Sequence, residues 1–292
     1  MKRTKLCILL ILLMTTLFAD NKLNLSNPDD YYNAFLKTRA DLSGKEVVYY
    51  WTGTVYSFVP GEKDSPLFKF EGFNVAKLVK VEGGYEMLTR EAAFYEDLKT
   101  GQIIEKWQNP WLKKEVEVVQ IWNDPVNQSF VFPEQFRPYM HKLLPSNDLG
   151  NMMSFNLDLF LNYPSPLKRA DYPLNAQSDT YEAAELFRFF VQKSDLENVT
   201  LTSVPVSISW TRFSPWMPFM EMGDRPGNLV FSCSGFKLEN GFEDLPEHIK
   251  TYVIKQKPVF SKAPETYTEP NETSWTYFLK YMKENENTKT KK

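Results

Sequence analysis

The sequence is poor in the residues that mark the common enzyme classes and most metal sites. Among 292 residues there are only two histidines, His141 and His248, and they lie far apart in the chain. This distance argues against a histidine-rich zinc or copper site. A nucleophile elbow, a phosphate-binding loop and a dinucleotide-binding glycine motif are also absent. We therefore predict no metal site and no cofactor, and any enzyme activity would belong to an uncommon class.

Cysteine is too scarce to support a disulfide framework. Of the two cysteines, Cys7 lies in an apolar run near the N-terminus and Cys233 lies in a strand-like segment. If the N-terminal segment is removed, the remaining cysteine cannot form an internal disulfide, so core packing must hold the fold. We interpret Cys233 as a buried, inert thiol.

Long apolar runs are absent except at the N-terminus. There, three basic residues precede an apolar run over residues 6–14, and Ala19 stands before a polar stretch. These are the features of a secretory signal, and the run is shorter than the ~20 residues that span a bilayer. We predict a signal peptide over residues 1–19, cleaved near Ala19, and a mature protein that is periplasmic or secreted and does not span the membrane.

A surplus of positive charge is also absent. The chain has 34 basic and 37 acidic residues, a formal net charge of −3. Residues 1–19 hold three of the basic residues and no acidic one, so the mature chain has 31 and 37, a net charge of −6. Because phosphate binding needs clustered cationic charge, we predict no nucleic-acid partner.

Aromatic residues, in contrast, are abundant at 15% of the sequence. They combine with β-branched residues in segments typical of strands, separated by turn signals such as Gly83-Gly84. The predicted strands are 46–59, 67–81, 85–95, 102–108, 115–122, 155–163, 204–213 and 228–238. This rhythm favours an antiparallel meander closed into a barrel of about 8–10 strands, because closure removes exposed edges. A β-sandwich is the alternative fold.

Two regions are harder to interpret. Residues 123–148 and 164–178 are rich in turn-forming residues, and we predict long loops there. Residues 179–193 carry both helix and strand signals, and we favour a strand from about Leu186. In 155–163 the alternation predicts that Phe155, Leu157, Leu159, Leu161 and Tyr163 share one face.

The two ends of the mature chain are predicted to be helical or unstructured around a single β domain. The predicted organisation is a lead-in over 20–44 with a short helix capped near Asn27, one domain over 45–283 with helices at 245–256 and 273–283, and a disordered tail over 284–292.

Residues 209–227 form an aromatic and methionine-rich segment that leaves a predicted strand. Trp216, Met217, Phe219 and Met220 would be costly to expose, so we expect this segment to cover apolar surface. Two interpretations remain open: a lid over a pocket mouth, or a plug in which Asp224 and Arg225 only fix a turn. In the first, the ligand-binding residues are Trp210, Trp216 and Phe219 as apolar wall and Arg212, Asp224 and Arg225 as polar contacts.

Carboxylates on predicted strands supply candidate acid–base residues. Glu91, Asp158 and Glu272 are the candidate catalytic residues, and Arg212 could pair with Asp158 or Glu91 inside a barrel. If these groups face water, they have no special role. Glu272 precedes a helix, so it could instead act only as a helix cap.

Several unusual motifs resemble a known family. They are Ser209–Arg212, Pro215–Trp216, Met222–Gly227, Asp244–His248 and Pro270–Tyr277. Together they resemble the domain of unknown function family DUF1838 over about residues 30–283. The resemblance implies a mainly bacterial, often exported protein with a lipocalin-like (calycin) barrel. It implies no activity, and so it assigns no catalytic residue.

Three functions follow as hypotheses. The first is an exported protein that binds a small, partly aromatic or apolar molecule in the barrel. The second is a metal-independent lyase, isomerase or hydrolase that uses a carboxylate and Arg212. The third is a structural or interaction protein, which requires residues 213–220 to be exposed.

Overall fold

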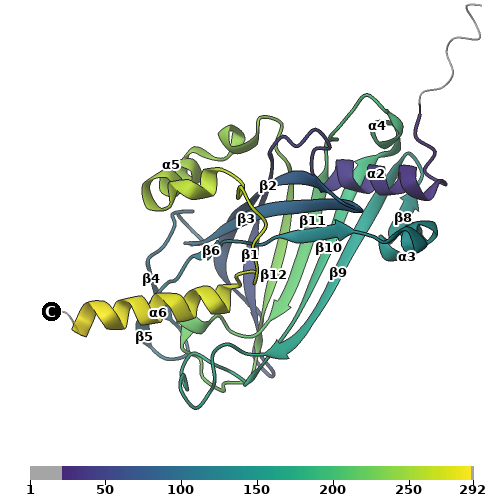
Figure 1. The fold of residues 1–292 in the computed structure, drawn as a ribbon. Coiled ribbons are helices and arrows are strands. Elements are labelled where there is room, and N and C mark those ends of the chain that lie inside the picture. The colour runs from purple at the N-terminus through teal and green to yellow at the C-terminus, as the bar shows by residue number, and fades with distance from the viewer. Residues whose placement is uncertain (1–21, 291–292) are drawn as a thin grey trace, which may run out of the picture.

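The computed structural model describes residues 22–290, with side chains described as far as 285. The predicted signal peptide, residues 1–19, lies outside the described residues. The described chain is dominated by antiparallel strands (Figure 1). The strands are β1 (Val47–Phe58), β2 (Ser65–Val81), β3 (Gly84–Glu96), β4 (Lys106–Asn109), β5 (Lys114–Glu117), β6 (Ile121–Asn123), β7 (Gln128–Val131), β8 (Ser146–Leu149), β9 (Met152–Pro164), β10 (Thr180–Gln192), β11 (Ser207–Ser214) and β12 (Asn228–Lys237).

Helices lie mainly before and after the strands. The α-helices are α2 (Pro28–Arg39), α3 (Met140–Leu143), α4 (Lys193–Glu197), α5 (Glu247–Gln256) and α6 (Ser274–Thr290), and the 3-10 helices are η1 (Glu134–Tyr139), η2 (Pro218–Met220), η3 (Gly241–Asp244) and η4 (Pro258–Ser261). Asn27 caps α2 as predicted, because its Oδ1 accepts hydrogen bonds from the backbone N–H groups of Asp29 and Asp30. No helix within residues 22–290 is long and apolar enough to cross a membrane.

One ten-stranded sheet contains most of the strands, in the order β6-β3-β2-β1-β12-β11-β10-β9-β8, with β7 also paired to β3. Every ladder in it is antiparallel, and β4 and β5 form a separate hairpin. The prediction of a mainly β, antiparallel fold is therefore confirmed. The long pairing of β1 with β12 joins the first and last thirds of the described chain.

The predicted closure into a barrel is wrong, because within the described residues β6 and β7 at one edge form no ladder with β8 or β9 at the other. The edge strands β6, β7 and β8 are only three or four residues long. Between β7 and β8 the chain folds into η1 and α3 instead of extending the sheet. Short, covered edges protect a sheet against unwanted pairing almost as well as closure does.

Helical segments span the opening between the sheet edges. The hydroxyl of Tyr32 on α2 donates to Phe130 O on β7 (2.5 Å), and that of Tyr31 donates to Ser146 Oγ on β8 (2.7 Å). Figure 1 shows α2 beside α3, α4 and β8, far from α5 and α6.

The segment that leads into α6 spans another part of the opening between the sheet edges. The backbone N–H of Glu272 donates to Pro125 O, just after β6, at 2.8 Å. The ring of Trp275 lies 4.7 Å from that of Tyr181 on β10. The predicted C-terminal helix is therefore part of the enclosure, and it runs to Thr290, beyond the predicted end at Lys283.

Both faces of β1–β3 are buried, and this explains their nearly continuous apolar sequence. On β1, Tyr49 and Trp51 point to the inner core, whereas Val48 and Tyr50 point to an outer core shared with α5. The ring of Trp51 occupies the space that a Cβ at Gly72 would fill, at 2.6 Å. A side chain at position 72 would therefore displace Trp51 from the inner face.

Two predicted boundaries need correction. Strand β10 begins at Thr180, six residues before Leu186, because Tyr181 to Glu185 pair with β9 despite their helix-favouring composition. The predicted loop over residues 123–148 contains β7, η1, α3 and β8. Tertiary pairing overrode local propensity in both regions.

Candidate functional site

A cavity of about 230 Å³ lies between the inner face of the sheet and the helical segments that span its opening. For scale, an apolar cavity of about 150 Å³ can hold benzene. The side chains that line it come from α2, eight strands, the start of α6, and the loop residues 126, 272 and 273. They are Arg39, Tyr49, Trp51, Asn74, Met87, Glu91, Asn123, Val126, Gln128, Leu157, Leu159, Leu161, Tyr163, Tyr181, Glu185, Phe187, Phe189, Ile208, Trp210, Arg212, Glu272, Thr273, Ser274 and Trp275.

Aromatic and aliphatic side chains form most of the cavity wall. The ring of Trp210 stacks on Phe187, with centroids 5.8 Å apart and planes at 18°, and meets Trp51 edge-on at 6.0 Å. Leu157, Leu159 and Leu161 of β9 complete this wall, as the predicted alternation requires. Such a surface suits a flat, apolar molecular body.

A charged group lies within this wall around Arg212, which is 7% exposed. Its Nη2 donates to the hydroxyl of Tyr181 (2.9 Å), and its Nε lies 3.6 Å from Glu185 Oε1. Burial raises the pKa of Tyr181, and burial with the charge of neighbouring Tyr181 raises that of Tyr163 to about 12. Arg212 therefore stays charged among neutral phenols and one carboxylate.

Glu91 lines the same cavity and is the one candidate acid–base residue with a pKa near neutrality. Burial and, to a lesser degree, the charge of Glu185 raise its pKa to about 7, although Arg212 and a hydrogen bond from Asn123 (3.3 Å) oppose the shift. A carboxyl group with such a pKa exchanges its proton readily near pH 7.

Arg39 provides a second, half-buried cation in the cavity. Its guanidinium lies 4.3 Å from the centroid of Phe189, and its Nη2 donates to Gln128 Oε1 (3.2 Å). No acidic side chain of the described residues forms an ion pair with it. Burial lowers its pKa, which means that the surroundings do not compensate its charge fully.

Buried polar atoms without hydrogen-bond partners concentrate around this cavity. Of nine such atoms in the described side chains, six belong to residues that line it: Arg39 Nε, Trp51 Nε1, Asn123 Oδ1, Trp210 Nε1, Arg212 Nε and Glu272 Oε1. Of the six, Arg212 Nε faces Glu185 Oε1 and Glu272 Oε1 pairs with Lys280, which leaves three N–H donors without an acceptor: Arg39 Nε, Trp51 Nε1 and Trp210 Nε1. A buried unsatisfied polar group costs roughly 1–3 kcal/mol, so this cluster calls for a partner that carries acceptor atoms.

Four of the residues predicted from the sequence line the cavity: Trp210, Arg212, Glu91 and Glu272. Glu272 is 9% exposed, pairs with Lys280 and accepts a hydrogen bond from the backbone N–H of Asp124 (3.3 Å). It therefore has a structural partner as well as a position beside the cavity.

Asp158 does not belong to the cavity. It lies on the outer face of β9, where it forms an exposed ion pair with Arg188. The predicted pair of Arg212 with Asp158 is therefore wrong, because the two side chains point to opposite faces. The partner of Arg212 is Glu185, directly opposite it in the β10–β11 ladder.

The segment 209–227 does not line the cavity beyond Arg212. Trp216 and Phe219 are buried, and Phe219 packs on Tyr95 with centroids 5.1 Å apart. Asp224 and Arg225 form exposed ion pairs with Arg169 (2.9 Å) and Glu62 (2.5 Å), away from the cavity.

This segment is therefore a plug rather than a lid. Met217 and Met220 are buried as well, so Phe213, at 43%, is the one exposed aromatic side chain in the 213–220 stretch that the interaction hypothesis requires to be exposed. Cys233 is also buried, and burial raises the pKa of its thiol to about 12, which agrees with an inert role.

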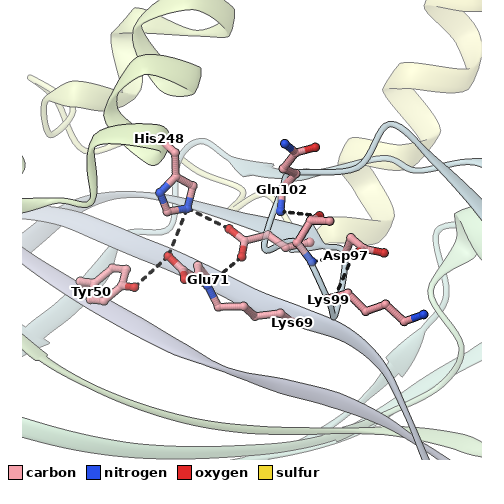
Figure 2. A network of polar contacts seen from close by, with 9 residues as sticks. Tyr50, Lys69, Glu71, Asp97, Lys99, Gln102 and His248 are labelled. Atoms are coloured by element: carbon pink, nitrogen blue, oxygen red, sulfur yellow. Dashed lines mark hydrogen bonds and ion pairs between the residues drawn. The ribbon is translucent and has the colours of Figure 1, made fainter.

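A second group of buried charges lies on the outer face of β2 and β3, below α5. Figure 2 shows the Glu71 carboxylate between the Tyr50 hydroxyl, the Lys69 ammonium and the His248 ring. His248 Nε2 lies 3.1 Å from Glu96 Oε1, and Tyr50 donates to Glu71 Oε2 at 2.8 Å. Burial raises the pKa of Glu96, the charge of Glu71 raises it further, and Lys69 and His248 oppose that shift.

Several site residues were not predicted, and for some the sequence held a usable signal. With β10 extended to Thr180, period-two alternation places Tyr181 and Glu185 on the face of Phe187. Arg39 gave no such signal, because a basic residue in the last turn of a helix normally indicates only a favourable helix end. Glu71, Glu96 and His248 meet only through tertiary structure.

The comparisons with known proteins support the resemblance drawn from the motifs. The model of the family described as protein of unknown function (DUF1838) matches residues 44–282. That range covers the sheet and every cavity-lining residue except Arg39, which lies with α2 before the matched range. Among curated proteins, no match was found.

Proposed function

We propose that this chain, which belongs to the DUF1838 family, is an exported protein that binds a small molecule with a flat, apolar body and an anionic group. Three N–H donors on the cavity wall that lack an acceptor, Arg39 Nε, Trp51 Nε1 and Trp210 Nε1, carry the proposal. The N-terminal sequence pattern, with its basic start and short apolar run, supports export.

The walls fix the expected orientation of the ligand. Its apolar body would lie against Trp210, Phe187 and the leucines of β9. Its anionic group would face Arg39, which has no acidic partner within the described residues, rather than Arg212, which already faces Glu185. A charge-assisted hydrogen bond contributes roughly 1.5–3 kcal/mol, or about 10–100-fold in affinity.

A direct test compares 2-naphthoate with the neutral alcohol 2-naphthylmethanol, using calorimetry and quenching of tryptophan fluorescence. We expect naphthoate to bind at least about tenfold more tightly. In Arg39→Met this preference should disappear, while in Arg188→Met, which removes an arginine from the outer face, it should persist. Equal binding of both compounds, or no binding, would contradict the anionic specificity.

Native mass spectrometry of the exported mature protein complements this test. A ligand that leaves only on denaturation would identify the natural compound class. A retained compound without any acidic group would argue against the role proposed for Arg39.

A second candidate function is acid–base catalysis in the same cavity, favoured by the pKa of about 7 at Glu91. Glu91 would transfer a proton, and Arg212 would stabilise negative charge that develops on the substrate. Compounds recovered from the cavity should then be converted by the wild-type protein and not by Glu91→Gln. Unchanged compounds in both proteins would leave binding alone as the function.

A further inference from the structure

We propose that Glu71, Glu96 and His248 form a binding site for one divalent transition-metal ion, such as Zn²⁺ or Mn²⁺, on the outer face of the sheet. The site lies beneath α5 and shares no residue with the cavity. It is independent of the function proposed for the cavity.

The donor atoms are already arranged at the spacing that a metal requires. Nε2 of His248 lies 3.1 Å from Glu96 Oε1 and 3.6 Å from Glu71 Oε2, and one ligand atom from each residue falls within 4.8 Å of the others. Metal bonds of about 2.0–2.2 Å in tetrahedral geometry separate two ligand atoms by roughly 3.3–3.6 Å. Small side-chain shifts would therefore be enough to bind an ion.

The position of Lys69 leaves the metal-binding oxygens free. Its Nζ pairs with Glu71 Oε1 and with Glu96 Oε2 (3.1 Å), whereas the other oxygen of each carboxylate faces His248. Lys69 thus reduces the repulsion between two buried carboxylates without occupying the space beside the imidazole. With His248 neutral, the group has a net charge of −1, which still attracts a divalent cation.

The surroundings resemble those of known metal sites in two further respects. Tyr50 donates to the ligating oxygen of Glu71, and outer-shell hydrogen bonds of this kind orient metal ligands. The Glu96 side chain is fully buried, whereas that of His248 is 45% exposed. A rigid, buried pair of carboxylates and an accessible imidazole would give the ion a path from solvent.

The ligand set indicates the kind of metal. Two carboxylate oxygens and one imidazole nitrogen suit the borderline ion Zn²⁺ and the harder, oxygen-preferring Mn²⁺ better than soft Cu⁺, which prefers sulfur ligands. Three protein ligands leave at least one position for water, as in catalytic metal sites.

Calorimetric titration of the metal-depleted mature protein with ZnCl₂ and MnCl₂ tests the proposal. We expect one ion per chain and a higher melting temperature in its presence. His248→Ala and Glu96→Gln should weaken binding by at least about 100-fold, and Tyr50→Phe by about tenfold. Lys69→Met should bind more tightly, because it removes a positive charge next to the ion.

His141→Ala, at the other histidine, serves as the matched control and should bind like the wild type. Circular dichroism and 2-naphthoate binding show whether each variant keeps its fold. Absence of binding, or binding that survives both His248→Ala and Glu96→Gln, would overturn the proposal. The proposal is also overturned if the wild type binds no ion and metal-free His248→Ala melts at a lower temperature than the metal-free wild type. The cluster would then be only an ion-pair network.

Discussion

Two glutamates on the same strand, Glu91 half-buried and Glu96 buried, have different surroundings on the two faces of this sheet. Glu91 and Glu96 lie five residues apart on β3, so they point to opposite faces. Glu91 faces the aromatic cavity and receives one amide hydrogen bond, from Asn123. Glu96 faces the outer core and meets Lys69 and His248.

The two carboxylates differ in the charged partners that the chain provides for them. Glu96 has the ammonium of Lys69 beside one oxygen, and its other oxygen faces the imidazole of His248, as does an oxygen of Glu71. Glu91 has no direct ion pair within the described residues, and it shares its cavity with donors that lack acceptors. The outer face is therefore suited to an inorganic cation, and the inner face to an organic molecule that brings its own charge.

The largest effect on stability should come from replacing Arg212, one of the two cations that line the cavity. Arg212→Met leaves Glu185 buried without its partner, and breaking a buried pair typically costs ~3–5 kcal/mol of unfolding free energy. Chemical denaturation measures this loss. Arg188→Met removes the exposed pair with Asp158 and should cost less than ~1 kcal/mol. Similar losses in both variants would mean that the inner charges are as well solvated as the outer ones.

The next largest effect should be a gain in stability from Glu91→Gln at high pH. Folding raises the pKa of Glu91 from 4.5 to about 7, so the folded state binds the proton more tightly than the unfolded state. The stability that Glu91 contributes is therefore present below pH 4.5 and is lost as the pH rises through 7. At pH 8 the variant should exceed the wild type by up to about 3 kcal/mol.

The pH dependence distinguishes this prediction from a simple packing effect. The difference between wild type and Glu91→Gln should be small near pH 4.5 and grow steadily to pH 8 in thermal melts. Asp158→Asn, which changes an exposed carboxylate on β9 outside the cavity, serves as the control. A constant difference across this range would mean that Glu91 does not titrate as its burial requires.

Much of the fold could be predicted because its strands follow simple periodicity. The alternation in 155–163 correctly placed the inward residues of β9, and the glycine pair at 83–84 marked the β2–β3 hairpin. Closure of the sheet was predicted wrongly, because it depends on whether distant edges meet. Here α2 and the segment before α6 fill that opening, and local sequence contains no signal for this.

The candidate site was predictable only where its residues lie on clear strands. Glu91 was identified because it interrupts a half-apolar strand, and Trp210 and Arg212 because they begin the aromatic segment 209–227. Asp158 was placed wrongly because Arg212 and its partner were matched by charge alone, without the register that sets Glu185 opposite it. The cluster around His248 needed α5 to dock on the sheet, which no spacing in the sequence specifies.

The smallest expected effect on stability comes from replacing His248, on the outer face of the sheet. In metal-free protein, His248→Ala should lower the unfolding free energy by less than ~1 kcal/mol, because the half-exposed imidazole adds little to a carboxylate pair that Lys69 already neutralises. Ile249→Val, which trims the buried contact of α5 with the sheet, should cost ~0.5–1.5 kcal/mol and serves as the reference. A loss above ~2 kcal/mol for His248→Ala would make the imidazole a structural anchor of α5. In that case Glu71 and Glu96 would depend on His248 as a partner from the chain itself, as Glu185 on the inner face depends on Arg212. His248 would then not be free to bind an ion.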